Sequence, residues 1–393
     1  MALTLGRRAL LAGGGIALAA RSRSALADAG ADAGTDAAAS ASGSLGLLRF
    51  GGAQSHNLAT PLHLFDRAIT PTPVFFVRSH FGAPALDRTR RLAVAGLVTT
   101  GLSLTVDDLK KMPKVTLTTV LQCAGNGRAL HTPRVPGIQW VHGAMGQATF
   151  GGVRLRDLLT KAGLDKEGRY VRVQGADLAP KPAVPAFVRS IPIERAMDPT
   201  TIVAYEMNGE DLTLAHGAPM RLVVPGWAGD HWVKWLTTLR VEKEEADGFY
   251  MKTAYRMPTE PVEPGATVPP EKMKPATTFP VKSIIARPAA TGREPIGRQE
   301  VVGFAFSGEA PIAAVEVSID GGKTFAPAKL EGEGGLGRAQ VFRFSFEQTT
   351  PGKVVAIARA KDKKGNVQPE KPAWNPSGYF WNGWHRVEWE VVP

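Results

Sequence analysis

The stretch Leu121-Gln-Cys-Ala-Gly-Asn-Gly-Arg128 decides how this chain is interpreted. It follows a run of β-branched residues that is typical of a strand, and it ends in a small, polar turn. A thiol at Cys123 is therefore expected at the mouth of a strand, where it can bind a ligand. Gly125 and Gly127 allow another group to approach the backbone closely, and Arg128 favours the thiolate form of the cysteine.

Cys123 is the only cysteine of the chain. One thiol excludes an intramolecular disulfide, a zinc or iron–sulfur site with several cysteines, and covalent haem attachment through two cysteines. The residues alone leave two other roles open for Cys123. It can be a buried packing residue, or a nucleophile activated by one of the eight histidines, although no protease-type sequence surrounds it.

Length and composition predict a globular protein of two or three domains. The chain has 393 residues, 44% of them apolar, and a net charge of +11. Four arginines of the first 27 residues, which hold no acidic residue, leave +7 for the rest. These charges are scattered, so we expect no nucleic-acid partner.

The N-terminus is typical of an export signal. Arg7 and Arg8 precede an apolar stretch, 9–20, and the small residues of Ala25-Leu26-Ala27 suit a cleavage site. We therefore expect residues 1–27 to be a twin-arginine signal peptide and the mature protein to be periplasmic. The apolar stretch is too short to span a membrane, and no later segment is long enough. Residues 28–44 are rich in Ala, Gly, Ser and Asp and predict a flexible spacer.

Residues 45–257 predict an α+β domain with many loops. Strand patterns occur at 91–95, 115–121 and 220–224. The pattern Thr105-Val-Asp-Asp108 predicts a capped helix that Pro113 ends, and Gly163 is expected to end a second helix over 155–162.

A change of architecture follows this domain. Residues 258–280 contain seven prolines and predict a stiff, extended linker. Residues 281–393 then predict an all-β sandwich of immunoglobulin type, because short runs alternate with period two between glycine turns. These runs are 300–306, 314–319, 341–346, 354–358 and 386–391, with turns at 320–322 and 364–366.

Several blocks in order give the chain a resemblance to a known family. They include Phe75-Phe-Val-Arg-Ser-His80, Leu121-Gln-Cys-Ala-Gly-Asn126, Gly151–Leu159, Ser190–Pro199, Ala204–Gly209, His216–Arg221, Val233–Trp235, Val317–Thr324 and Trp384–Arg386. From Phe75 to the C-terminus the chain resembles the sulfite oxidase family of molybdenum enzymes. The resemblance implies an α+β molybdopterin-binding domain of sulfite oxidase type, an immunoglobulin-like dimerisation domain and a homodimer.

The resemblance also implies a cofactor site. In this family molybdenum is held by the two dithiolene sulfurs of a pterin and by one cysteine, and Cys123 matches that ligand. A soft thiolate suits such a metal. Further positions match residues that bind the pterin and its phosphate tail: Phe76, Arg78, Ser79, His80, Asp177, His216, Arg221, Trp232, Val233 and Lys234. Taken singly, each of them could instead cap a loop.

Four residues match the family's catalytic set. Arg78 and Arg128 resemble its anion-binding arginines, whose planar forks bind oxyanions in pairs of hydrogen bonds. Trp140 resembles a tryptophan of the anion pocket, and Tyr255 resembles the active-site tyrosine. The alternatives are a plain core or surface aromatic for Trp140 and a linker tyrosine at the domain boundary for Tyr255.

The implied reaction is oxidation of sulfite to sulfate at molybdenum, with electrons passed singly to an external acceptor such as a c-type cytochrome. The chain reads Asn375-Pro-Ser377-Gly378 where animal enzymes have Asn-Leu-Arg-Gly, so one anion-pocket arginine is replaced, and we expect no haem in this chain. Two other functions stay open: a related molybdenum oxidoreductase acting on nitrate or an S-oxide, and a secreted binding protein without cofactor.

Overall fold

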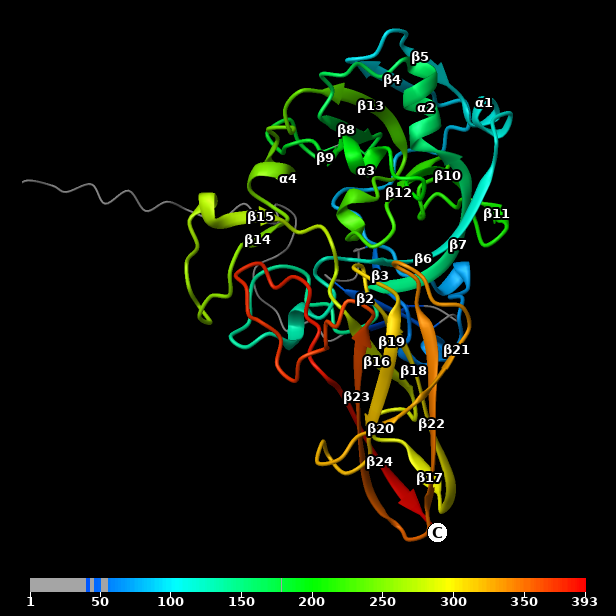
Figure 1. Cartoon of the computed structure of the whole chain (residues 1–393), viewed down its shortest axis with the longest axis vertical. Coiled ribbons are helices and arrows are strands. Elements are labelled where there is room, and N and C mark those ends of the chain that lie inside the picture. The colour runs from blue at the N-terminus through cyan, green and yellow to red at the C-terminus, as the bar shows by residue number, and fades with distance from the viewer. Residues whose placement is uncertain (1–39, 43–45, 51–55, 178) are drawn as a thin grey trace, which may run out of the picture.

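The computed structural model describes residues 40–42, 46–50, 56–177 and 179–393. Its long axis joins an α+β part, built mostly from residues before 258, to a slender β-sandwich that ends at the C-terminus (Figure 1). The expected fold class, an α+β domain followed by an immunoglobulin-like sandwich, is confirmed. The expected signal peptide, 1–27, lies outside the described residues.

Two five-stranded sheets form the α+β part. The first has the order β11-β10-β7-β6, with β12 beside β10, and the second has the order β5-β4-β13-β8-β9. The strands of the first are β6 (Val115–Gln122), β7 (Met145–Arg154), β10 (Ile202–Met207), β11 (Glu210–Asp211) and β12 (Arg221–Val223). The strands of the second are β4 (Leu92–Gly96), β5 (Leu102–Leu104), β8 (Tyr170–Gly175), β9 (Val188–Pro192) and β13 (Leu236–Glu242).

Short helices connect these strands. They are α1 (Val106–Lys110), α2 (Leu155–Ala162), α3 (Ile193–Ala196) and α4 (Phe249–Lys252), with 3-10 turns η1 (Leu62–Asp66), η2 (Thr72–Val74), η3 (Arg128–Leu130), η4 (Gly229–His231) and η5 (Pro270–Lys272). The predicted capping box is confirmed, because the Thr105 hydroxyl accepts from the Asp108 backbone N–H and the Asp108 carboxylate accepts from that of Thr105. None of the helices in the described ranges is both long and apolar enough to cross a membrane.

The predicted spacer at 28–44 differs from the structure at its end. Ser40–Ser42 form a strand, β1, that pairs with β2 (Leu47–Phe50), and β2 pairs with β3 (Asn57–Ala59). Strand pairing uses backbone groups, so a segment without large apolar side chains can still add an edge to a sheet.

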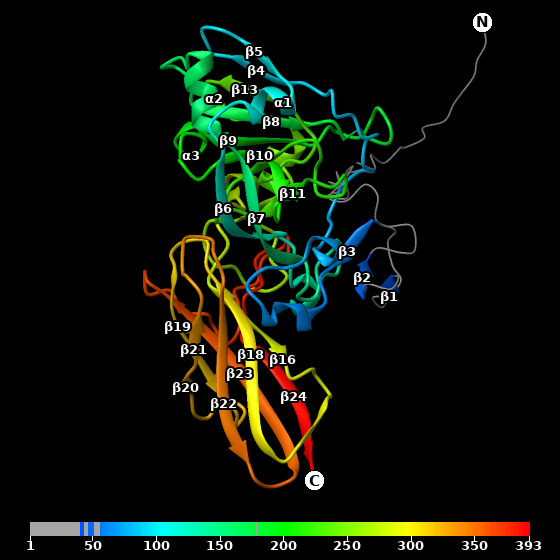
Figure 2. The same ribbon diagram turned by 90° about the vertical axis from the view of Figure 1, so that its right-hand side faces the viewer.

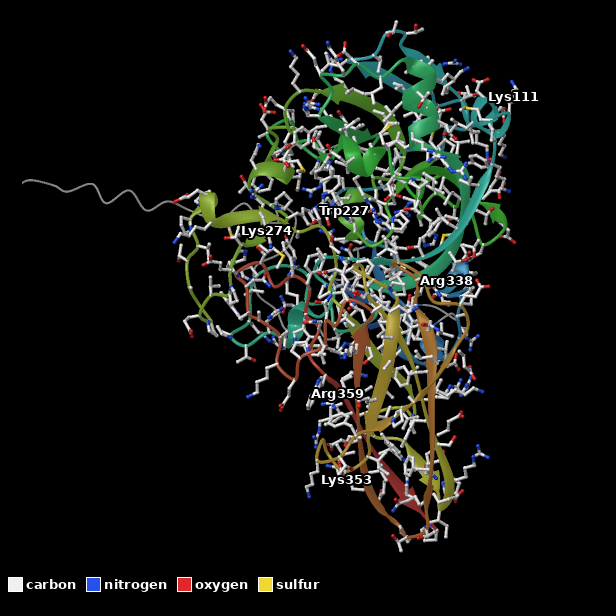
Figure 3. The ribbon with its side chains drawn as sticks, viewed as in Figure 1. Lys111, Trp227, Lys274, Arg338, Lys353 and Arg359 are labelled. Carbon is white, nitrogen blue, oxygen red and sulfur yellow. The ribbon has the colours of Figure 1, made fainter. Side chains whose placement is uncertain are left out.

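The predicted linker also differs from the structure. Its first residue, Pro258, pairs with Met273 later in the segment, because β14 (Arg256–Pro258) runs antiparallel to β15 (Met273–Pro275). The chain then packs onto the α+β part: Thr278 forms a β-bridge with Trp227, which Figure 3 labels near the middle of the molecule. Prolines at strand edges are compatible with such pairing, and the segment is therefore a folded excursion rather than an extended rod.

The sandwich domain consists of two sheets around one apolar core (Figure 2). One sheet has the order β16-β18-β22-β21 and the other β17-β24-β23-β19-β20. Their strands are β16 (Lys282–Arg287), β17 (Arg293–Pro295), β18 (Gly297–Phe306), β19 (Ile312–Ser318), β20 (Ala326–Pro327), β21 (Lys329–Glu331), β22 (Gln340–Gln348), β23 (Gly352–Asp362) and β24 (His385–Val392). All five runs predicted from period-two alternation lie within or overlap these strands.

Candidate functional site

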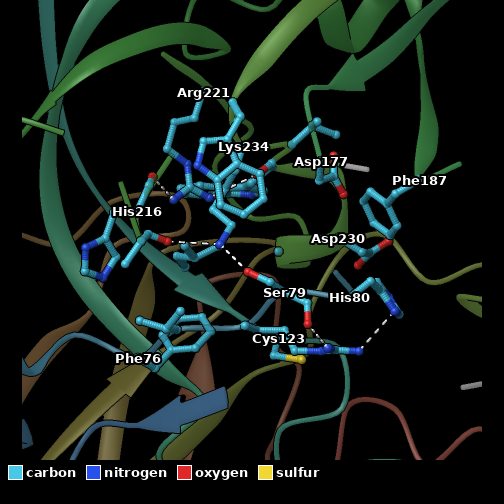
Figure 4. A pocket seen from close by; sticks show the side chains of 18 of the residues that line it. Phe76, Ser79, His80, Cys123, Asp177, Phe187, His216, Arg221, Asp230 and Lys234 are labelled. Carbon is cyan, nitrogen blue, oxygen red and sulfur yellow. Dashed lines mark hydrogen bonds between the residues drawn. The ribbon is translucent and has the colours of Figure 1, made fainter. Parts of the chain in front are cut away.

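A single pocket in the α+β part gathers most of the predicted site residues (Figure 4). Its empty space amounts to about 730 Å³, open solvent at its mouth included. All eleven residues predicted to bind the cofactor line this pocket, and Tyr255 lines it too: Phe76, Arg78, Ser79, His80, Cys123, Asp177, His216, Arg221, Trp232, Val233 and Lys234. They come from chain segments up to about 180 residues apart, so only the tertiary fold brings them together.

The ends of strands position these side chains. Cys123 directly follows β6, Asp177 follows β8, and Arg221 begins β12. The Phe76–His80 segment crosses the pocket between η2 and β4. Turns that leave a sheet at its edge can place side chains toward a shared cavity, which is where ligands bind in many α/β and α+β proteins.

Positive charge dominates one wall of the pocket. The Lys234 ammonium donates to Ser79 Oγ at 2.6 Å and to the Ala215 carbonyl at 3.0 Å. The Arg221 guanidinium donates to the carbonyl oxygens of His216 and Trp232. Burial lowers the pKa of Arg221 to about 9, and burial followed by the charge of Arg221 lowers the pKa of Lys234 well below its usual value. This wall therefore favours an anionic ligand, because its negative charge would offset the cost of burying both cations.

Unsatisfied polar atoms face the same region. Among the described residues, His216 Nε2 and Arg221 Nε are buried without a hydrogen-bond partner. Asp177 lies across the pocket, and burial raises its pKa to about 6. A buried polar atom normally has a partner, so these atoms indicate a ligand with both hydrogen-bond donors and acceptors.

Arg78 and His80 orient the hydroxyl group of Tyr255 in the pocket. Arg78 Nη2 lies 3.2 Å from His80 Nδ1 and can only donate, so this nitrogen of the ring accepts. Burial, and next the charge of Arg78, lowers the pKa of His80 well below its usual value, so the ring is neutral and its proton is on Nε2. His80 Nε2 then donates to the Tyr255 hydroxyl oxygen. The hydroxyl proton of Tyr255 is left to donate to a ligand.

Cys123 is buried, with 8% of its surface exposed. Its backbone N–H donates to the Ala144 carbonyl, which fixes the turn after β6. Arg128 favours the thiolate, as expected, and so does Arg78, but burial is the larger effect and raises the pKa of the Cys123 thiol. The protein alone therefore keeps the thiol protonated, and a cationic ligand atom would have to displace that proton.

The two predicted glycines serve a different purpose from the one expected. A Cβ atom on Gly125 would lie 2.9 Å from Arg128 Nη2, and one on Gly127, whose φ is 93°, would lie 2.7 Å from Trp381 Cβ. The close approach is thus made by an arginine of the same turn and by the sandwich domain. Neither glycine lines the pocket.

Two predicted catalytic residues do not line this pocket. Trp140 is fully buried, and its ring centroid lies 4.9 Å from that of Phe50. Arg128 donates to the carbonyl oxygens of Ser377 and Ile138, and it influences the pocket through its charge. Tyr255, in contrast, lines the pocket, and its ring also packs at the domain boundary.

Sequence reasoning missed a buried charged pair at the back of the pocket. Arg189 on β9 and the pocket residue Asp230 lie 2.8 Å apart, and His231 contacts both. Phe187, Trp235 and Gly229 also line the pocket. Adjacent acidic and histidine residues were the signal for Asp230, but nothing local pairs them with an arginine 41 positions earlier in the printed sequence.

Comparison with known proteins now adds to this geometry. Residues 80–250 match the family described as "Oxidoreductase molybdopterin binding domain", and residues 273–392 match "Mo-co oxidoreductase dimerisation domain". The sulfite oxidase of Arabidopsis thaliana is 33% identical over 82% of this chain and 88% of its own length. The chain belongs to the sulfite oxidase family of molybdopterin oxidoreductases.

Further members of the family extend the comparison. The mitochondrial sulfite oxidase of Mus musculus is 37% identical over 88% of this chain, and the chain spans 66% of that protein's length. The crystal structure of the sulfane dehydrogenase SoxCD from Paracoccus pantotrophus superposes with a TM-score of 0.74 at 31% identity, covering 84% of this chain and 83% of that one. The pocket thus belongs to a fold that this family shares.

Proposed function

We propose that this protein oxidises sulfite to sulfate at a molybdenum centre held in the pocket and passes two electrons, one at a time, to a separate acceptor such as a c-type cytochrome. Sulfite and water become sulfate, two protons and two electrons. The observation that carries the proposal is the convergence of Cys123, Tyr255 and the cations Arg78, Arg221 and Lys234 on one pocket. The names of the related enzymes support a sulfur compound as the substrate.

The pocket fits a pterin cofactor with a phosphate tail. Lys234 and Arg221 would bind the anionic tail, and His216 Nε2, Arg221 Nε and Asp177 would bind polar atoms of the heterocycle. Cys123 would supply one sulfur to the metal. The bound cofactor supplies oxygen-atom transfer and two-electron redox chemistry, which no side chain can supply.

The protein's own residues position the substrate. Arg78 and Arg128 offer guanidinium charge to a sulfur oxyanion, and Tyr255 offers its hydroxyl proton to an oxygen atom. Because His80 is neutral and donates to Tyr255, it holds that hydroxyl oriented without adding charge. Burial of these groups excludes water and strengthens their interactions with an anion.

We also propose the setting in which this chemistry occurs. Residues 1–27 would direct the folded protein to the periplasm, where a c-type cytochrome can accept electrons. Residues 273–392 match a dimerisation domain, which supports a homodimer. A dimer of this kind would be noncovalent, because the single cysteine lies in the pocket.

The Cys123→Ser variant tests the proposal. In the wild type we expect sulfite-dependent reduction of ferricyanide with close to one molybdenum per chain. In the variant we expect sulfite turnover to be lost while pterin, measured by its fluorescence after release, is still bound through the cationic wall. The matched control is Ser103→Ala, a hydroxyl change on the edge strand β5 at a residue that does not line the pocket.

Three outcomes would contradict the proposal. Full sulfite oxidation by Cys123→Ser would remove the cysteine from the metal. Molybdenum in the wild type without sulfite turnover would favour the nitrate or S-oxide function, and absence of both metal and pterin would favour a binding protein.

A further inference from the structure

A loop of the sandwich domain, residues 375–381, lies directly against the turn that follows Cys123. The Phe380 backbone N–H donates to the Ala124 carbonyl at 2.9 Å, and Arg128 Nε donates to the Ser377 carbonyl at 3.1 Å. A Cβ atom on Gly378 would lie 2.8 Å from Arg128 Cγ. The two segments therefore fit each other without room for an added methyl group.

Tyr379 is the residue of this loop that contacts catalytic side chains on both sides. Its ring stacks on that of Tyr255, with centroids 5.6 Å apart and planes 3° from parallel. The Arg128 guanidinium carbon lies 5.4 Å from the centroid of the Tyr379 ring. A cation at this distance from an aromatic ring is attracted by its quadrupole, and stacked rings hold each other in place.

The backbone of Tyr379 is fixed independently of its ring. Asn375 Oδ1 accepts from the Tyr379 N–H at 3.0 Å, and Asn375 Nδ2 donates to the Tyr379 carbonyl at 2.8 Å. The Ser377 hydroxyl donates to the carbonyl of Arg256, the residue after Tyr255. Only 8% of Tyr379 is exposed. The loop therefore holds the Tyr379 ring in one position.

The Arg128 guanidinium is held by this loop and by one carbonyl of its own domain. Its Nε contacts Ser377, its Nη1 donates to the Ile138 carbonyl, and its carbon lies near the Tyr379 ring. Arg128 Nη2 has no hydrogen-bond acceptor among the residues that the structure describes. The charge reaches the pocket, because Arg128 lowers the pKa of the pocket residue His80.

We propose that Tyr379, anchored on the ring of Tyr255, is a positioning residue that orients the Arg128 guanidinium toward the substrate anion. The inference rests on the proposed function. It gives the sandwich domain a part in substrate binding even though Ser377, at the position of the family's arginine, carries no charge. The loop supplies no cation of its own. It acts by holding the Arg128 guanidinium of the other domain in position.

Two substitutions at Tyr379 separate ring contacts from the hydroxyl group. Tyr379→Leu removes the stack and the cation contact, so we expect KM for sulfite to rise about two- to tenfold with kcat nearly unchanged. The dissociation constant of sulfate, measured by calorimetry on the molybdenum-loaded protein, should rise by the same factor. Tyr379→Phe keeps the ring and should behave as the wild type in both measurements.

The Arg128→Gln background distinguishes positioning from a structural role. If Tyr379 acts through Arg128, adding Tyr379→Leu to Arg128→Gln should change KM and sulfate affinity no further. A structural defect would instead lower molybdenum content and add to the effect of Arg128→Gln. If Tyr379→Leu loads poorly with molybdenum, Tyr379→Met, which fills more of the space, takes its place.

The result that overturns the inference is unchanged KM and unchanged sulfate affinity in a fully loaded Tyr379→Leu protein. That result leaves the proposed function intact, because the wild type still oxidises sulfite. Failure of the wild type to oxidise sulfite would contradict the proposed function alone, and sulfate affinity would then decide the inference.

Discussion

Two opposite charges beside the pocket, those of Arg189 and Asp230, are buried as a pair. The side chains of Arg189 and Asp230 are 0% and 1% exposed, and their nearest charged atoms are 2.8 Å apart. His231 Nε2 lies 2.9 Å from Arg189 Nη2, and Arg189 also donates to the Tyr250 carbonyl. Because the Arg189 guanidinium lies 5.3 Å from the Tyr255 ring, this pair also supports the wall that carries the hydroxyl group.

We expect Arg189→Met to destabilise the protein strongly. The change leaves the Asp230 carboxylate buried without its cation, which costs about 3–5 kcal/mol in comparable pairs. The free energy of unfolding from urea titration, followed by tryptophan fluorescence, measures the loss. Lys243→Met is the control, since its pair with Glu167 is more than half exposed, and its midpoint should stay near that of the wild type. If the two variants lost equal free energy of unfolding, the buried pair would contribute no more to stability than the exposed one.

The C-terminal end of helix α2 shows how one residue directs the chain from the first sheet to the second. Helix α2 ends at Gly163, whose φ is 71°. The N–H of Gly163 donates to helix carbonyls, and the N–H groups of Thr99 and Thr100 donate to the carbonyls of Gly163 and Ala162. This positive φ favours glycine, because a Cβ atom in the left-handed region meets the neighbouring carbonyl oxygen.

Gly163→Ala should therefore cost more stability than the same change at another left-handed glycine. Both Gly163 and Gly209 have positive φ, so each substitution carries a backbone penalty of about 1–2 kcal/mol. At Gly163 the new Cβ would also lie 2.8 Å from Thr99, whereas at Gly209 it meets no atom within 4 Å. Thermal unfolding of the two variants compares the penalties, and a smaller loss at Gly163 than at Gly209 would contradict the packing argument.

The whole molecule depends on a basic, buried cluster where the two domains meet. His385 of the sandwich and His142 of the α+β part have ring centroids 4.4 Å apart, and Ile285 N–H donates to His385 Nδ1. The fully buried Lys282 donates to the Trp381 carbonyl at 3.1 Å. Burial, and then the charge of Lys282, lowers the pKa of His385 to about 3, and burial lowers that of Lys282 to about 7.

These shifts give the protein a stability that falls with acid. Between pH 6.5 and about 3 an unfolded His385 binds a proton that the folded ring does not, so the free energy of unfolding decreases as the pH falls through this window. We expect His385→Asn, whose Oδ1 can accept from Ile285, to flatten that dependence in urea titrations at several pH values. His63→Asn, on an exposed turn, should leave the slope unchanged. An unaltered slope in His385→Asn would assign acid sensitivity to other groups.

The sequence by itself determined the features that depend on neighbours along the chain. The capping box at Thr105, the helix end at Gly163 and the sandwich strands follow from local geometry and from the period of apolar residues. The family resemblance also named most of the residues that line the pocket, although not Asp230, and the physical patterns alone could not place them in one cavity.

Only the tertiary structure decided which distant groups meet. It folded the proline-rich segment back on itself, paired Arg189 with Asp230, and brought Tyr379 of the second domain to Arg128 of the first. Each of these contacts joins residues that no periodicity or spacing relates, because its energy exists only after two surfaces have packed together and excluded water. Local signals specify elements, and the packing of those elements specifies the site.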